Sequence, residues 1–361
     1  MTISRQTTVA VIGMAATLLG VGCARPSPSV REVDTRISYY QDRVRSEPRL
    51  YPAYALLGAA YLDKARCAHD PVWLARSREA LARSMEIQLN FDAMKSMAAV
   101  CNFSHRFEDA LLWIDRAAGA MPEDTSLVAM RVEALLALGR VTEAQRAVTA
   151  LGLADDFYVA AARGQVAIAM GRLDDARVAF FDSAEAASAQ KANELQGWAL
   201  VMAAGTLIDS GRTANAKPLL ESARALDPDS VELAIHDAEV LEAEGQPESA
   251  LATYAHLAND SGDPALHAKS FTLARKLGHH RDAAAHFKAA ESGFQKAIDA
   301  GEVYTLEALA MLYLEAGESI ERVRPLATEN IKYKQDRSAV ELMNRVNATT
   351  SPPSLSEDAA Q

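Results

Sequence analysis

The chain has 361 residues, a formal net charge of −11 and only 6% aromatic residues. It is too long for one ordinary hydrophobic core, although a repeat protein reaches this length by stacking similar units. Abundant alanine with so few aromatic side chains argues against an all-β fold. The acidic balance makes nucleic acid and anionic membrane surfaces poor partners, so we expect no nucleic-acid partner.

The N-terminus carries the pattern of an export signal. Arg5 is followed by a charge-free stretch, and residues 9–21 are mostly apolar. This run is too short for a comfortable membrane span and fits the apolar region of a signal peptide over residues 1–22. Small residues then lead directly into Cys23.

Residues 18–23 resemble the lipobox of bacterial lipoproteins, in which the cysteine is acylated and becomes the mature N-terminus. The resemblance implies lipidation of Cys23, a tether over residues 23–29 and membrane attachment through the lipid. Gly20 departs from the aliphatic residue that the lipobox prefers. Ala24 is not the aspartate associated with inner-membrane retention, so the resemblance implies an outer-membrane protein that faces the periplasm. The alternative is an ordinary signal peptide with an incidental cysteine.

After the tether, the apolar spacing predicts helices in pairs. Residues 30–48 place apolar side chains on one helical face and predict a capping half-repeat. Residues 51–90 predict the first helix pair, with an insertion within residues 63–75. Residues 91–124 predict a second pair without an insertion.

In the rest of the chain, one glycine marks the turn between the two helices of each predicted unit, because a left-handed residue closes the first helix. An alanine follows the glycine by five residues in all units but the last, and four units have a large residue four positions further on. The glycines, 32 to 40 residues apart, are Gly139, Gly171, Gly211, Gly245, Gly278 and Gly317.

The clearest unit, residues 197–230, has two short helices, small residues at close-contact positions and a final Asp-Pro stop. It resembles the tetratricopeptide repeat. The resemblance implies an all-α solenoid, a right-handed superhelix of antiparallel helix pairs with terminal capping helices, over residues 30–346. Residues 336–346 predict a last, solvating helix, and residues 347–361 a disordered tail.

Some features depart from a regular repeat. Extra residues are expected after two second helices, near residues 184–195 and 291–301. Pro218 and Pro325 fall within second helices, where proline is tolerated only near the first turn. We therefore expect the helix around Pro325 to kink or to start late.

The sequence contains no phosphate loop, dinucleotide fingerprint, nucleophile elbow or zinc-protease motif, so we expect no enzyme activity and no cofactor. Histidines crowd residues 236–286, which leaves a metal- or ligand-binding protein as the alternative function. We favour no metal, because these histidines lack ligand spacing on one helix. They are His236, His256, His267, His279, His280 and His286.

Cys67 and Cys101 lie near the ends of first helices in consecutive units. Exported proteins mature in oxidising compartments, so a disulfide between them is one expectation. The alternative is two separate small apolar residues, with Cys101 in the core.

Tetratricopeptide proteins bind chiefly through the concave surface formed by their first helices. The predicted phase exposes there the residues Lys95, Asn102, Phe103, Glu133, Gln165, Trp198, Asp209, Glu239, Glu242, Lys269 and Arg275. Trp198 is the preferred anchor because of its large apolar ring, although packing against residues 184–195 is the alternative. Glu239 and Glu242 give the surface an acidic character and favour a basic or amphipathic partner.

Together these features predict a non-enzymatic interaction scaffold: an envelope lipoprotein that holds protein or peptide partners in a periplasm-facing assembly. The sequence does not choose among the envelope pathways.

Overall fold

The computed structural model describes residues 30–152 and 155–348, which contain 18 helices and no strand. A capping helix, α2 (Val30–Ser46), precedes eight helix pairs, and α19 (Arg337–Ala348) follows them. We call the pairs units 1 to 8. Their first helices are α3 (Tyr51–Ala68), α5 (Phe91–Phe103), α7 (Ser126–Ala137), α9 (Phe157–Ala169), α11 (Asn193–Asp209), α13 (Val231–Ala243), α15 (Pro264–Leu277) and α17 (Leu306–Ala316).

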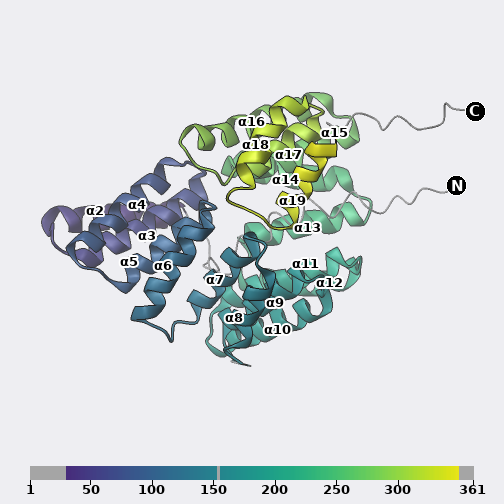
Figure 1. Cartoon of the computed structure of the whole chain (residues 1–361). Coiled ribbons are helices and arrows are strands. Elements are labelled where there is room, and N and C mark those ends of the chain that lie inside the picture. The colour runs from purple at the N-terminus through teal and green to yellow at the C-terminus, as the bar shows by residue number, and fades with distance from the viewer. Residues whose placement is uncertain (1–29, 153–154, 349–361) are drawn as a thin grey trace, which may run out of the picture.

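The second helices of the units, in the same order, are α4 (Val72–Ile87), α6 (Phe107–Ala120), α8 (Val141–Thr149), α10 (Leu173–Ala189), α12 (Thr213–Leu226), α14 (Pro247–Ser261), α16 (His280–Asp299) and α18 (Ile320–Asn330). Neighbouring helices in the chain pack side by side, and the units curve until the last ones lie beside the first (Figure 1). The predicted all-α fold of stacked helix pairs is confirmed.

The turn between the two helices has the predicted left-handed backbone. All six marker glycines have φ between +70° and +81°. Units 1 and 2 place a histidine at the same position, His69 with φ of 48° and His105 with φ of 57°. A left-handed conformation is uncommon for a residue with a Cβ, so these two turns differ physically from the others.

Close crossings between helices of one unit are filled by a small residue on one helix and a large one on the other. A Cβ added to Gly164 would lie 2.7 Å from the ring of Phe180, and one added to Gly58 would lie 2.5 Å from Leu81. The alanines that follow the turn glycines, such as Ala176 and Ala216, are fully buried. The predicted pattern of small and large residues is therefore the packing pattern of the core.

The expected insertions are mostly helical. Residues 63–75 form the end of α3 and the start of α4, with only a short turn around Asp70 between the two helices. Residues 184–195 end α10 and begin α11, and residues 291–301 mostly extend α16. The extra residues therefore continue helices instead of forming long connections, and Pro71, the one proline among these three stretches, lies in the short turn before α4.

The late start of the helix around Pro325 and the C-terminal helix follow the predictions, whereas both helix prolines lie in the second turn and not in the first. Pro218 and Pro325 are each the sixth residue of their helices, and α18 begins late, at Ile320. Helix α19 covers the predicted solvating helix. The predicted signal peptide, Cys23 and its tether, and most of the predicted tail lie outside the described residues.

Among residues 30–152 and 155–348, none of the helices combines the length and the apolar character needed to cross a bilayer.

Ala204 tests the packing of the most regular unit. It is fully buried at a close contact of α11, so Ala204→Leu should destabilise the fold by roughly 1–3 kcal/mol through overpacking. Chemical denaturation followed by circular dichroism measures this loss. Ala214→Leu, at an exposed position of α12, is the matched control and should leave the midpoint nearly unchanged. Equal midpoints for both variants would contradict the assigned packing.

Candidate partner-binding surface

The residues predicted to line the inner surface divide into buried and accessible groups. Asn102 is only 1% exposed, and its amide donates to the Met130 carbonyl at 2.9 Å and to Glu133 Oε2 at 3.3 Å. Glu133 and Gln165 are also buried. The prediction that these three side chains are exposed was wrong, because neighbouring first helices pack closely enough to enclose them.

Two further predicted residues contact other parts of the solenoid. Lys95 Nζ donates to Asp124 Oδ2 at 2.8 Å. Phe103 is half-buried, and its ring centre lies 5.6 Å from that of Tyr304. Both side chains are therefore engaged in contacts with other residues of the chain.

Trp198, the preferred anchor, packs between units 4 and 5. Its ring meets Phe157 and Phe180 edge-on, with centroids 5.7 Å and 6.1 Å away. It also packs with the buried cluster that includes Ala184 and Ala187. The indole therefore serves mainly as core, which leaves only part of its surface to a partner.

Apart from Arg275, which is exposed near the end of α15, the other predicted residues form a charged cluster on the first helices of units 5 to 7. His236 Nδ1 lies 2.7 Å from Glu239 Oε2, and Lys269 Nζ donates to Glu239 Oε1 at 2.9 Å. The imidazole fits over Gly205 of α11, where an added Cβ would lie 3.2 Å from the ring. Glycine at this position makes room for the histidine and so fixes the position of Glu239.

The electrostatics of the cluster favour an ionised Glu239. Burial alone would raise the pKa of Glu239, but hydrogen bonds and charges from His236 and Lys269 lower it to about 2. Desolvation by the surrounding protein raises the pKa of the Asp209 carboxyl, and the negative charge of Glu239 raises it further. The two carboxylates therefore repel each other electrostatically across adjacent units.

Glu242 completes the cluster, which we call the acidic cluster: Asp209, His236, Glu239, Glu242, Tyr254 and Lys269. The Tyr254 hydroxyl donates to Glu242 Oε1 at 3.2 Å. Lys269 Nζ lies 5.4 Å from the centre of the Tyr254 ring. Glu242 and Asp209 both keep exposed surface. Three carboxylates thus face one ammonium group and one imidazole. Tyr254, which sequence reasoning assigned only to the core, was missed as a member.

The histidine-rich units use their histidines in separate local contacts. His267 and His286 approach each other at 2.9 Å between Nδ1 atoms, His256 lies near Asp260, and His279 near Glu248. Burial lowers the pKa of both His267 and His286. Within the described ranges, no group of three or more histidine, cysteine or acidic residues is arranged to hold a metal ion.

Cys67 and Cys101 are free thiols, so the structure does not contain the expected disulfide. They belong to different clusters: Cys101 is in the core of units 1 to 4, whereas Cys67 packs near Trp73 and its Sγ lies 3.5 Å from the Lys64 carbonyl. Burial raises the pKa of the Cys101 thiol to about 12. Cys101 is a core residue, as the second sequence interpretation has it.

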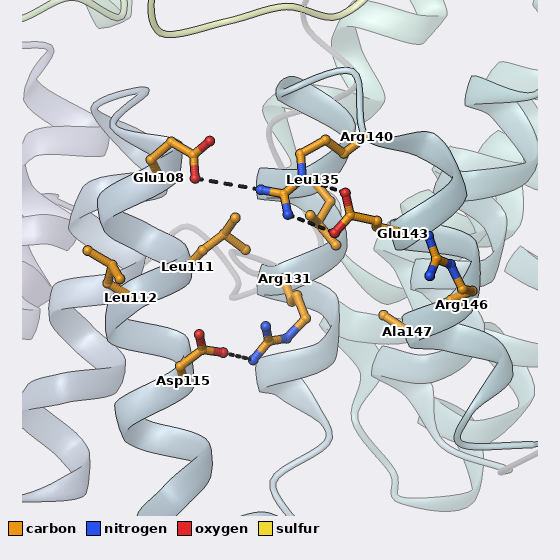
Figure 2. A pocket seen from close by; sticks show the side chains of 10 residues that line it. All are labelled: Glu108, Leu111, Leu112, Asp115, Arg131, Leu135, Arg140, Glu143, Arg146 and Ala147. Atoms are coloured by element: carbon orange, nitrogen blue, oxygen red, sulfur yellow. Dashed lines mark hydrogen bonds and ion pairs between the residues drawn. The ribbon is translucent and has the colours of Figure 1, made fainter.

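A separate hollow of about 510 Å³ lies between α6 and α8, above α7 (Figure 2). Most of its charged side chains pair with one another: Arg131 donates to Asp115 at 2.6 Å, and Arg140 pairs with Glu108 and Glu143, whereas Arg146 donates to the Thr142 carbonyl at 3.4 Å. Leucines lie between these pairs. Because the charges in this hollow are paired with one another, except that of Arg146, it offers less to a charged partner than the acidic cluster does.

Residues 207–270 match the sequence model of the tetratricopeptide repeat. No curated protein matches the chain. Among solved structures, the human IFIT1 dimer with PPP-AAAA is similar at 14% identity and a TM-score of 0.45, over 87% of this chain and 74% of that one. A tetratricopeptide repeat protein from Parabacteroides merdae is similar at 12% identity and 0.38, over 82% and 98%. Yeast Tom70 is similar at 13% identity and 0.35, over 96% and 66%.

The chain therefore has the fold of a tetratricopeptide-type helical repeat protein. Such scaffolds are generally non-catalytic and typically serve protein–protein interaction.

The ionisation of Glu239 makes a testable contribution to stability. Its pKa is about 2 in the folded chain against an ordinary value of 4.5, so its stabilisation is complete above the ordinary value and is lost as pH falls toward 2. Linkage sets this contribution on the order of 3 kcal/mol. Urea denaturation between neutral and acidic pH should show Glu239→Gln less stable than the parent near neutrality. The two stabilities should converge on acidification, whereas a constant difference would contradict the assignment.

Proposed function

We propose that this chain is a non-enzymatic scaffold of the bacterial envelope that holds a protein partner against the acidic cluster of units 5 to 7. The observation that carries the proposal is the arrangement of Asp209, Glu239 and Glu242 on adjacent first helices. Glu239 is held ionised between His236 and Lys269, and its two neighbours keep exposed surface. Fixed negative charge on a repeat surface suits a basic or amphipathic segment.

The recognition would be mainly electrostatic. The partner's cations would face Asp209 and Glu242, while the partly exposed stem of Lys269 offers apolar contact beside them. Attraction between partly exposed charges raises the association rate and is screened by salt. The bound segment therefore needs basic residues more than a large apolar face.

The envelope location is the second part of the proposal. It rests on the sequence of residues 1–23, with a charge-poor apolar run that ends at Cys23. A lipidated Cys23 would anchor the solenoid to the outer membrane, where the units face the periplasm.

The partner surface is tested with a short amphipathic Lys/Leu peptide as the probe and its Glu/Leu counterpart as the negative control. Asp209→Lys and Glu242→Lys should each weaken binding of the basic peptide by about tenfold and reduce the salt dependence of its association rate. Surface plasmon resonance across a salt series measures both quantities.

Glu221→Lys is the matched control, because Glu221 is exposed on the second helix α12. It makes the same charge change outside the cluster. An equal effect of all three variants would mean that overall charge, and not the acidic cluster, attracts the peptide.

Anchoring is tested separately. Cys23→Ser should release the protein from the membrane fraction of an expressing bacterium, because the acylated side chain is lost. Retention in membranes equal to that of the parent chain contradicts the lipoprotein proposal.

A further inference from the structure

The left-handed turn position has different surroundings in the first three units than in the last five. A Cβ added at the turn glycines of units 4 to 8, Gly171, Gly211, Gly245, Gly278 and Gly317, would meet nothing within 4 Å. In unit 3, a Cβ on Gly139 would lie 2.5 Å from the Gln335 carbonyl oxygen. Units 1 and 2 have His69 and His105 there. The turns of units 1 to 3 thus touch another part of the chain.

That other part consists of the connections that follow the last second helices. In unit 1, His69 Nδ1 lies 3.8 Å from Asp263, the N-cap of α15, and Asp70 Oδ2 accepts from Lys296 Nζ at 2.8 Å. Arg78 of α4 pairs with Glu302 in the connection between α16 and α17. All these contacts join residues almost 200 or more positions apart in the sequence.

Units 2 and 3 continue the same contact line. Arg106 donates to the Gly301 carbonyl at 3.3 Å, and Tyr304 packs against Phe103. The Gln335 backbone N–H donates to the Ala137 carbonyl at 2.7 Å. Successive turns of units 1, 2 and 3 therefore meet the segments that precede α15, α17 and α19. This order of contacts is that of a superhelix whose second turn stacks on its first, as Figure 1 shows for the returning C-terminal helices.

The seam, as we call this contact line, is chemically unlike the interfaces between neighbouring units. Its contacts are mostly ion pairs and hydrogen bonds, whereas adjacent helices share an apolar core. Glu302 is only 3% exposed, yet its Oε2 atom and the Nη1 atom of Arg78 have no hydrogen-bond partner among the described residues. Both groups would regain water if the seam separated, which lowers the cost of opening.

One end of the seam is held by a buried lysine. Lys334 Nζ donates to Glu307 Oε2 at 2.6 Å and lies 3.2 Å from Asp336 Oδ2. These pairs fix the connection between α18 and α19 so that Gln335 meets Ala137. The amide of Gln335 is therefore a local reporter of whether the seam is closed.

We propose that the seam is a salt-sensitive latch that opens and closes as a unit and controls lateral access to the inner surface. The access role rests on the proposed function, in which a partner segment binds the acidic cluster. When the seam is closed, the stacked turns restrict entry from the side. When it opens, an internal segment of a partner reaches the first helices without threading from a chain end.

The latch is tested by reversing the charge of its buried acid. Glu302→Lys places two cations together and should raise amide hydrogen exchange of Gln335 at least about tenfold, although Gln335 lies in a different part of the seam. The radius of gyration from small-angle X-ray scattering should increase, with helicity unchanged. The double variant Arg78→Glu/Glu302→Lys should restore both values.

Exposed positions provide a second set of variants that leaves the core intact. Lys296→Asp should speed Gln335 exchange, and the double variant Asp70→Lys/Lys296→Asp should restore it. Arg224→Asp is the matched control, because Arg224 pairs with Asp237 at 2.6 Å between units 5 and 6, away from the seam. In the parent chain, raising NaCl from about 0.05 M to about 0.5 M should speed the same exchange.

The latch is overturned if Gln335 exchange and the radius of gyration stay at parent values in both Glu302→Lys and Lys296→Asp. It is also overturned if Lys296→Asp acts no differently from Arg224→Asp. These readouts need no peptide, so they stand apart from the proposed function. Faster association of the Lys/Leu peptide with Lys296→Asp than with Arg224→Asp supports the access role, and equal rates with an opened seam overturn that role alone.

Discussion

The close contact between a small residue on one helix and a large residue on its partner is the constraint on which the whole solenoid depends. A Cβ on Gly164 would lie only 2.7 Å from the ring of Phe180, and one on Gly58 only 2.5 Å from Leu81. These contacts set the distance between the two helices of a unit. Because every unit repeats nearly the same geometry, small rotations between units add up along the chain, and the last units return to the first.

The sequence predicted the features that depend on local geometry. A left-handed turn after a first helix needs glycine for reasons confined to a few residues, so Gly211 and its equivalents could be located without a structure. The insertions were harder. Residues 63–75 and 291–301 are extra in any repeat alignment, and only their helical continuation brings Asp70 and Lys296 to the seam. Their meeting depends on the accumulated curvature of the intervening units, which no local pattern records.

On the inner surface, too, the sequence predicts on which helix face a residue lies, but not how deeply its side chain is buried. Glu133, Gln165 and Glu239 all stand six residues before a turn glycine, so sequence places them on one face. The first two are buried and the third is 21% exposed, since the packing of neighbouring first helices differs from unit to unit. Gly205 holds the same position in unit 5 and admits the ring of His236. The pairing of His236 with Glu239 therefore depends on a residue that carries no charge itself.

Helix α15 connects the two charged regions of the molecule. Asp263 caps its N-terminus, accepting from the Ala265 N–H at 2.8 Å, and also faces His69 across the seam. Lys269, six residues further along the chain on the same helix, holds Glu239 in the acidic cluster. A cationic partner that competes with Lys269 for Glu239 acts on the helix whose first residues form the seam. Thermodynamic linkage then requires reciprocity: if binding at the cluster shifts the seam, opening the seam shifts affinity at the cluster by the same factor.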